Sequence, residues 1–129
     1  MIPNAKEKEL SIRLHELLKA KGELPEIREG DWVIHNESGN QFLIKNNSEA
    51  EAVNQYRETY ILLWSWERCR EWLREKGWGL EFLFEENNGE IIKIGFSHID
   101  NIPKEGWGQT DLEAAMAVMV QIAEEKDGE

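Results

Sequence analysis

The residues of this chain that could do chemistry include three histidines, one cysteine and 26 acidic side chains. The stretch from His15 to Lys19 begins like H-E-x-x-H, in which two imidazoles one helical turn apart bind one zinc ion. Lys19 replaces the second imidazole, so we reject a zinc site and interpret His15 as a surface residue of a helix. His35 and His98 each lie at the end of a predicted strand, and nothing accompanies Cys69 at metal-ligand spacing. The sequence therefore predicts no metal and no cofactor.

Nucleophilic catalysis needs a serine or cysteine within reach of a base that a third group orients. No serine lies in a strained G-x-S-x-G turn, and Cys69 falls on the apolar face of a predicted helix, where we expect an inert filler. Carboxylate pairs such as Glu81 with Glu85, or Asp100 with Glu105, could do acid-base chemistry, but 26 acidic residues produce some pairs by chance. We predict no catalytic residue. A small hydrolase that uses Asp or Glu is the least favoured interpretation.

Six tryptophans could form either a binding surface or the interior of a small domain. Trp66 and Trp72 share a helical face with apolar residues, which predicts that both belong to the core. The pattern constrains Trp64, Trp78 and Trp107 less, so an exposed aromatic patch should be drawn from these three. They are the candidate interaction surface.

The size and composition of the chain suit one domain over residues 1–129. A chain of 129 residues can bury more than half of its unfolded surface without a metal or disulfides. No apolar run approaches the roughly 18 residues that a membrane span needs. The first residues, MIPNAKEKELSIRL, carry charges where a signal peptide is apolar, and there is a single cysteine. We expect a cytoplasmic protein that does not bind membranes.

The formal net charge is -11, and the second half of the chain is the more acidic. Residues 1–64 carry 8 basic and 11 acidic side chains, whereas residues 65–129 carry 7 and 15. Nucleic-acid binding depends on Lys and Arg that replace counterions along the phosphates, so we expect no nucleic-acid partner. An acidic face can instead recruit a basic protein.

Caps and apolar periodicity predict three helices, at residues 5–21, 66–76 and 111–125. Their capping residues are Asn4, Ser65 and Thr110. Residues 48–58 are ambiguous, because Ser48 and Glu51 suit a capping box but the apolar spacing is thin, so a helix and a loop both remain open.

Alternating apolar residues predict a first hairpin from residues 31–35 and 41–45, and a strand at residues 59–64. A second hairpin follows residue 77. A two-residue Asn-Gly loop would divide its apolar side chains between the two faces, so we prefer a three-residue loop with a bulge. That register pairs Phe84 with Ile92, Phe82 with Ile94 and Leu80 with Phe96, and it brings Glu85 near Lys93. Residues 100–108 are predicted to be a loop whose glycines let Trp107 turn in against the domain.

The chain from residue 62 to residue 125 resembles small α/β sandwich proteins of phages and prophages, sometimes called ABA-sandwich proteins. The residues that carry the resemblance are Ser65, Trp72, Gly77, Trp78 and the run Gly108-Gln109-Thr110-Asp111-Leu112-Glu113-Ala114-Ala115-Met116. These are caps, turns and core residues. The resemblance implies an origin in a phage or mobile element, and it supplies no activity.

The fold class that these patterns predict is α+β, with a mainly antiparallel sheet built from two hairpins and packed against about three amphipathic helices. Because no catalytic spacing is present, the favoured function is a non-enzymatic phage-type accessory protein that binds a partner protein or itself as a homo-oligomer. The alternative is an acidic inhibitor or immunity-like protein that neutralises a basic partner.

Overall fold

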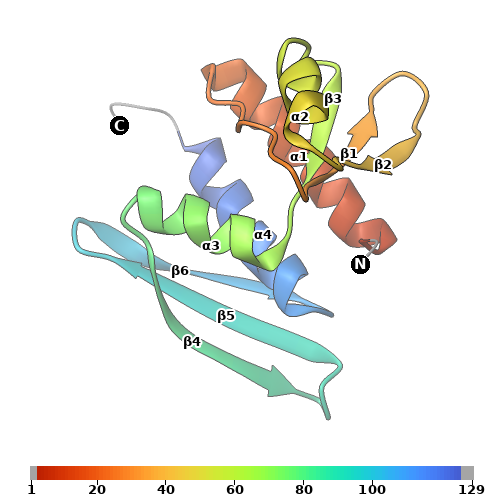
Figure 1. Cartoon of the computed structure of the whole chain (residues 1–129). Coiled ribbons are helices and arrows are strands. Elements are labelled where there is room, and N and C mark those ends of the chain that lie inside the picture. The colour runs from red at the N-terminus through yellow and green to blue at the C-terminus, as the bar shows by residue number, and fades with distance from the viewer. Residues whose placement is uncertain (1–2, 126–129) are drawn as a thin grey trace. The chain divides into compact units, whose positions relative to one another are not determined.

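The computed structural model describes residues 3–125 and shows an α+β protein, as predicted. These residues form four helices and two three-stranded antiparallel sheets (Figure 1). The chain divides into two compact units, residues 1–64 and residues 65–129, and each unit holds one sheet and two of these helices. The single domain over residues 1–129 stays a prediction. Within the described range, no helix has both the length and the apolar character that a membrane span requires.

The first unit begins with helix α1 (Ala5–Lys21), which starts and ends where the sequence predicts. The Asn4 side chain accepts a hydrogen bond from the Glu7 amide at 2.7 Å, and the Glu7 carboxylate accepts one from the Asn4 amide at 2.8 Å. Each side chain thus satisfies an amide at the helix N-terminus that has no partner within the helix. Gly22 ends the helix with a φ of 70°, which glycine adopts at little cost.

Helix α2 (Asn47–Asn54) forms in the segment for which both a helix and a loop were open. Its N-cap is Asn46 and not Ser48, because the Asn46 side chain accepts from the amide of Glu49 at 2.9 Å. At the other end, the Asn54 side chain accepts from the Ile27 amide and donates to the Ile27 carbonyl, both at 2.8 Å. These two bonds hold the connection after α1 against the end of α2.

The first sheet contains β1 (Trp32–His35), β2 (Gln41–Leu43) and β3 (Tyr60–Leu63) in the order β2-β1-β3. The pairing of β1 with β2 confirms the predicted first hairpin. Ile34, Ile61 and Leu63 form a buried cluster, against which Ile12 of α1 and Trp32 pack. At the end of β3, the Trp64 amide donates to the buried hydroxyl of Ser11 in α1 at 3.2 Å. Apolar contacts and one buried hydrogen bond therefore join α1 to this sheet.

The second unit contains helices α3 (Trp66–Glu75) and α4 (Asp111–Glu124), both close to their predicted bounds. Ser65 caps α3 by accepting from the Arg68 amide at 3.2 Å, and Thr110 caps α4 by accepting from the Glu113 amide at 3.0 Å. Trp72 is buried and Trp66 is partly buried, so the predicted core side of α3 is confirmed for Trp72 and holds in part for Trp66.

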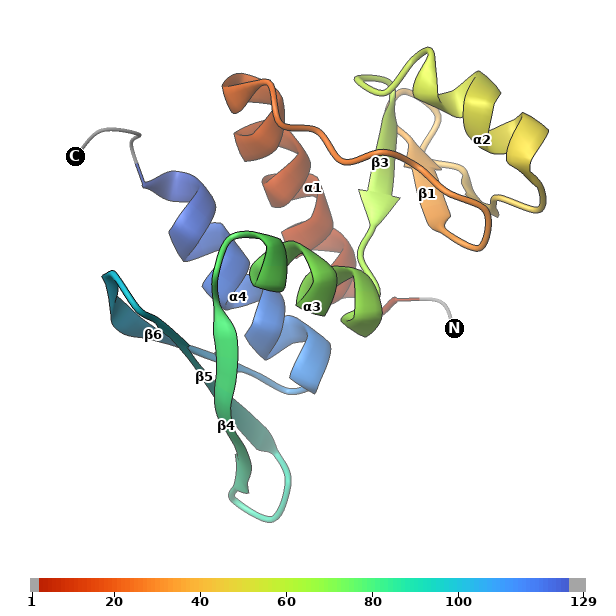
Figure 2. The same ribbon diagram turned by 60° about the vertical axis from the view of Figure 1, so that its left-hand side comes forward.

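The second sheet contains β4 (Gly79–Glu86), β5 (Ile91–His98) and β6 (Asn101–Gly108) in the order β4-β5-β6. Helices α3 and α4 both lie on one face of this sheet (Figure 2), and α4 packs against β5 and β6. The predicted loop over residues 100–108 is wrong, since most of this segment is β6. Its Pro103 and glycines weaken a strand signal, but an edge strand tolerates them because it pairs on one side only.

The predicted register of the second hairpin is wrong over most of its length. The structure pairs Phe82 with Gly95, Phe84 with Lys93 and Glu85 with Ile92, and only the predicted pair of Leu80 with Phe96 is present. The turn has four residues, Asn87–Glu90, because Asn87 and Asn88 both adopt positive φ angles that asparagine tolerates. A bulge between Leu80 and Phe82 shifts the register back toward the predicted one.

Two glycines let helix α4 approach β6 closely. A Cβ atom on Gly106 would lie 2.1 Å from the carbonyl oxygen of Ala114, and one on Gly108 would lie 2.5 Å from the Cβ of Glu113. Trp107 lies between these glycines and points to the opposite side, where it is 53% exposed. The expectation that Trp107 turns in against the domain is therefore wrong, because successive residues of a strand point to opposite faces.

Candidate functional site

The face of the β4-β5-β6 sheet that α4 does not cover carries aromatic and charged side chains. We call it the open face and define it by Phe82, Phe84, Lys93, Glu105 and Trp107. Strand pairing places these residues on one side, because Phe84 and Trp107 are both opposite Lys93 while Phe82 and Glu105 are both opposite the next outward residue, Gly95. The Phe82 and Phe84 rings stack with their centroids 5.2 Å apart. Three aromatic side chains from two strands thus lie on the same surface.

Lys93 occupies the centre of the open face. Its Nζ lies 4.7 Å from the centroid of the Trp107 ring and 5.7 Å from that of Phe84. The same Nζ is 3.5 Å from a carboxylate oxygen of Glu105. Lys93 therefore interacts with Glu105 and not, as predicted, with Glu85, which the observed register places opposite Ile92. A cation between two aromatic faces and a carboxylate holds these side chains in a defined arrangement.

Strand β4 exposes apolar side chains on both of its faces. Phe84 on the open face is 44% exposed, while Leu80 and Leu83 on the other face are 37% and 41% exposed. Ile94 and Phe96, which Leu83 and Leu80 oppose on β5, are fully buried. Burial of apolar side chains therefore ends at β5, and β4 remains accessible on both sides.

The large apolar side chains that are exposed in residues 3–125 are concentrated in this one sheet. All of them except Tyr56 belong to β4, β6 or the turn between β5 and β6: Leu80, Leu83, Phe84, Ile99, Ile102 and Trp107. They lie on both faces of the sheet, and exposed apolar side chains gathered on one element indicate a candidate binding surface.

The three tryptophans of the candidate interaction surface differ in their exposure to solvent. Trp64 and Trp78 are only 4% and 3% exposed, and Trp107 alone of the three is exposed. Trp78 contacts the His98 ring, with their centroids 5.1 Å apart, and the Nζ of Lys104 lies 5.8 Å from its centroid. Sequence reasoning missed Phe82 and Phe84 as open-face residues because the register it preferred placed them opposite Ile94 and Ile92. One signal could have placed Phe82: a glycine within a strand, here Gly95, leaves room for a neighbouring ring, and a Cβ there would lie 2.3 Å from that ring.

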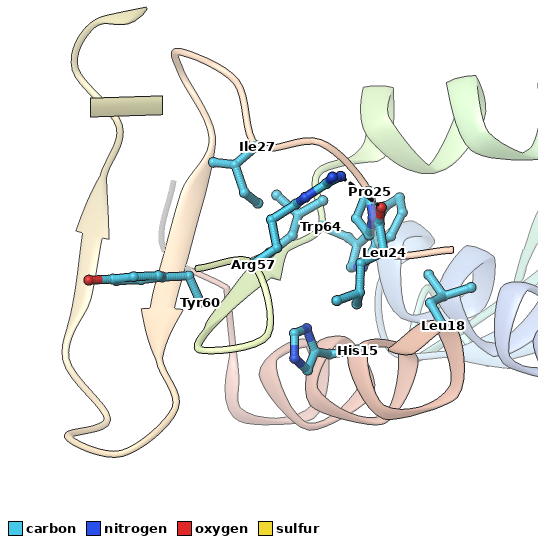
Figure 3. Close-up of a pocket in the computed structure, with 9 residues that line it drawn as sticks. His15, Leu18, Leu24, Pro25, Ile27, Arg57, Tyr60 and Trp64 are labelled. Carbon is cyan, nitrogen blue, oxygen red and sulfur yellow. Dashed lines mark hydrogen bonds between the residues drawn. The ribbon is translucent and has the colours of Figure 1, made fainter. Parts of the chain in front are cut away.

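A small hollow in the first unit brings together His15, Arg57 and apolar side chains (Figure 3). His15 is 7% exposed, so its predicted surface position is wrong; its Nε2 lies 3.1 Å from the carbonyl oxygen of Glu58. Arg57 donates to the carbonyl of Leu24 at 3.3 Å. The room for the centres of water molecules is about 10 Å³, which suits roughly one water and no substrate. Among residues 3–125, no carboxylate side chain lines this hollow, so none there can orient His15 for catalysis.

His15 should make the stability of the protein depend on pH. Burial lowers the pKa of His15 below its usual value of 6.5, and nearby Lys19 lowers it further, although the hydrogen bond to the Glu58 carbonyl opposes the shift. The unfolded chain then binds a proton more readily than the folded one, so stability is complete above pH 6.5 and falls as the pH drops below it. In urea titrations, His15→Gln should reduce the loss of unfolding free energy between about pH 7.5 and about pH 5. An unchanged pH profile would contradict this role.

His98 and His35 hydrogen-bond to nearby backbone groups, and Cys69 is buried, so these residues serve the fold. His98 links two turns, with Nε2 3.0 Å from the Lys76 carbonyl oxygen and Nδ1 accepting from the Asp100 amide at 3.0 Å. The ring nitrogen Nδ1 of His35 accepts from the Ser38 amide at 3.1 Å. Cys69 is fully buried in α3. Over residues 3–125, no three side chains among His, Cys, Asp and Glu are grouped so that they could hold a metal ion.

Comparison with known proteins reveals no relative of this chain. No protein-family model, no curated protein and no solved structure matches the chain.

Proposed function

We propose that this protein is a non-enzymatic accessory protein that acts by binding another protein through the β4-β5-β6 sheet. The observation that carries the proposal is the collection of exposed apolar side chains on that one sheet, with Phe84 and Trp107 on either side of Lys93 on its open face. Aromatic side chains are enriched in protein interfaces because they bury a large area at a small cost in conformational entropy. A cytoplasmic setting and an origin in a phage or prophage belong to the same proposal.

The arrangement of the open face supports a recognition role. Lys93 keeps the Trp107 and Phe84 rings on either side of a fixed charge, so the surface needs little reordering when a partner binds. Preorganised side chains lose less entropy on association, and more of the contact energy then appears as affinity. The hollow at His15 offers no comparable support for catalysis, since it suits roughly one water.

The alternative function, an acidic inhibitor of a basic partner, uses the same sheet with a different balance of forces. It is favoured by the four glutamates that lie between Lys76 and Lys93 without any basic residue. Binding dominated by exposed charges weakens as salt screens them, whereas binding dominated by the aromatic rings depends little on salt.

The proposal is tested by placing a photoreactive phenylalanine analogue at position 107 in cells where the protein naturally occurs. We expect one discrete crosslinked protein, and we expect Phe84→Ser in the same chain to lower its yield about tenfold, as the loss of a central interface residue does. The crosslinked protein is identified by mass spectrometry.

Tyr56 provides the matched control, because it is 62% exposed and lies outside the β4-β5-β6 sheet. The analogue at position 56 should not produce the crosslinked protein. Identical products from positions 56 and 107, or a yield that Phe84→Ser leaves unchanged, would refute binding through this sheet.

A further inference from the structure

The two edges of the β4-β5-β6 sheet differ in how well they are protected. A sheet edge presents backbone amides and carbonyls that another strand can bind, and proteins block this with proline, charged side chains such as lysine, bulges or short strands. Edge strand β6 contains Pro103, which has no amide hydrogen, followed directly by Lys104. Edge strand β4 has eight residues without proline or lysine, and only the bulge near Leu80 interrupts it. Beyond that bulge, from Phe82 to Glu86, β4 is therefore the less protected of the two edges and the one that a further strand can pair with.

The charges along β4 indicate what kind of strand fits there. The 16 residues from Gly77 to Ile92 contain Glu81, Glu85, Glu86 and Glu90 and no basic residue. Glu85 lies on the face toward α4, because it is opposite the buried Ile92, and Glu86 lies on the open face. Acidic groups thus line both faces beside the exposed Leu83 and Phe84.

A second copy of this chain is a poor occupant of that edge. In a symmetric antiparallel pairing centred on Leu83, Glu81 would lie directly opposite Glu85 of the second copy. Like charges directly opposite each other destabilise a strand pair, and no lysine or arginine in this stretch would compensate. The glutamates therefore disfavour self-pairing in that register, and they favour a partner that carries positive charge.

We propose that β4 accepts an extended basic segment of the partner protein as a fourth strand of the sheet. The backbone of the segment would pair with the free side of β4, its apolar side chains would cover Leu83 and Phe84, and flanking Lys or Arg would lie beside the glutamates. Main-chain hydrogen bonds would supply affinity, and the side chains would supply specificity. This inference rests on the proposed function and names the chemistry of the partner.

The probe for this site is a fluorescein-labelled peptide, KKVTVTVKK, with EEVTVTVEE as its charge-reversed control. By fluorescence anisotropy at low salt, we expect the basic peptide to bind at least about tenfold more tightly than the acidic one. The double variant Glu85→Lys with Glu86→Lys should weaken binding of the basic peptide about tenfold. The matched control, Glu37→Lys with Glu51→Lys, makes the same change in net charge at exposed positions of the first unit and should have little effect.

Backbone pairing is tested with two N-methylated versions of the basic peptide. Each version carries N-methyl groups on alternate backbone nitrogens, so that one series of nitrogens, along one edge of the peptide strand, is blocked in each. Only one edge of an added strand pairs with β4, so one version should lose about tenfold in affinity and the other should bind as before. Equal binding by both versions, or equal weakening by both pairs of Glu→Lys changes, would overturn the inference. So would concentration-dependent dimers in sedimentation that Glu85→Lys strengthens, since removal of the repulsion between Glu81 and Glu85 would then show a second copy paired at β4.

This test and the crosslinking test can fail separately. Crosslinking at position 107 together with failure of the basic peptide would leave the proposed function standing and refute the added strand. Peptide binding to β4 without a crosslinked partner would refute the proposed function and leave β4 as an edge that accepts a basic strand.

Discussion

Replacing Gly106 with alanine is expected to destabilise the protein by about 3 kcal/mol, because the new methyl group overpacks the contact between β6 and α4. Its Cβ would lie 2.1 Å from the backbone carbonyl oxygen of Ala114 and 2.8 Å from Cγ2 of Val118. A flexible side chain could move aside, but the carbonyl belongs to the backbone of α4, so the whole helix must shift from the sheet. Urea unfolding followed by tryptophan fluorescence measures the loss in unfolding free energy.

Gly79 is the matched control for Gly106, since it also lies in a strand of the same sheet. A Cβ on Gly79 would have no atom within 4 Å, and its φ is not positive. Gly79→Ala should therefore change the unfolding free energy by less than about 0.5 kcal/mol, or raise it slightly through the stiffer unfolded chain. Equal effects of the two substitutions would show that the separation of α4 and β6 is not set by Gly106.

Phe96→Ala is expected to cost about 3–5 kcal/mol, the second large effect on stability. The Phe96 side chain is fully buried, and its removal takes apolar atoms out of the interior and leaves a cavity that neighbouring groups fill only in part. A loss of this size is a large part of the stability of a typical domain, so the variant should unfold at much lower urea concentration.

Phe84 offers the comparison, because it is the same residue type in the neighbouring strand of the same sheet but is 44% exposed. Phe84→Ala should cost roughly 1 kcal/mol or less, since much of the ring already contacts water. The two variants also separate folding from binding. Phe84→Ala should retain the fold while it weakens partner binding, and an equal loss of stability in both would contradict the exposure of Phe84.

The helices were predictable from the sequence because their signals are local. Asn4, Ser65 and Thr110 each cap the helix that was assigned to them, and a cap requires only the amide three residues along the chain. Strand β6 was missed because Pro103 and the glycines at 106 and 108 hide its strand pattern, although its partner β5 directly precedes it in the chain.

The register of β4 shows why the candidate site could be predicted only in part. The apolar alternation at Leu80, Phe82 and Phe84 suggests one common face, but the bulge places Leu80 on the opposite face from the two phenylalanines. A bulge depends on the register between two strands. The turn that sets this register has positive φ angles at two asparagines, Asn87 and Asn88. The same limit applied to the tryptophans, since no pattern distinguished the exposed Trp107 from the buried Trp78.

The unequal edges of the β4-β5-β6 sheet bear on the stoichiometry of any complex. An added strand on β4 would itself become the new outermost strand, while Pro103 on β6 still hinders growth from the other side. If the incoming segment is a single short strand flanked by like positive charges, its outer side repels a second such segment. The assembly should then stop at one partner per chain and not extend into a filament.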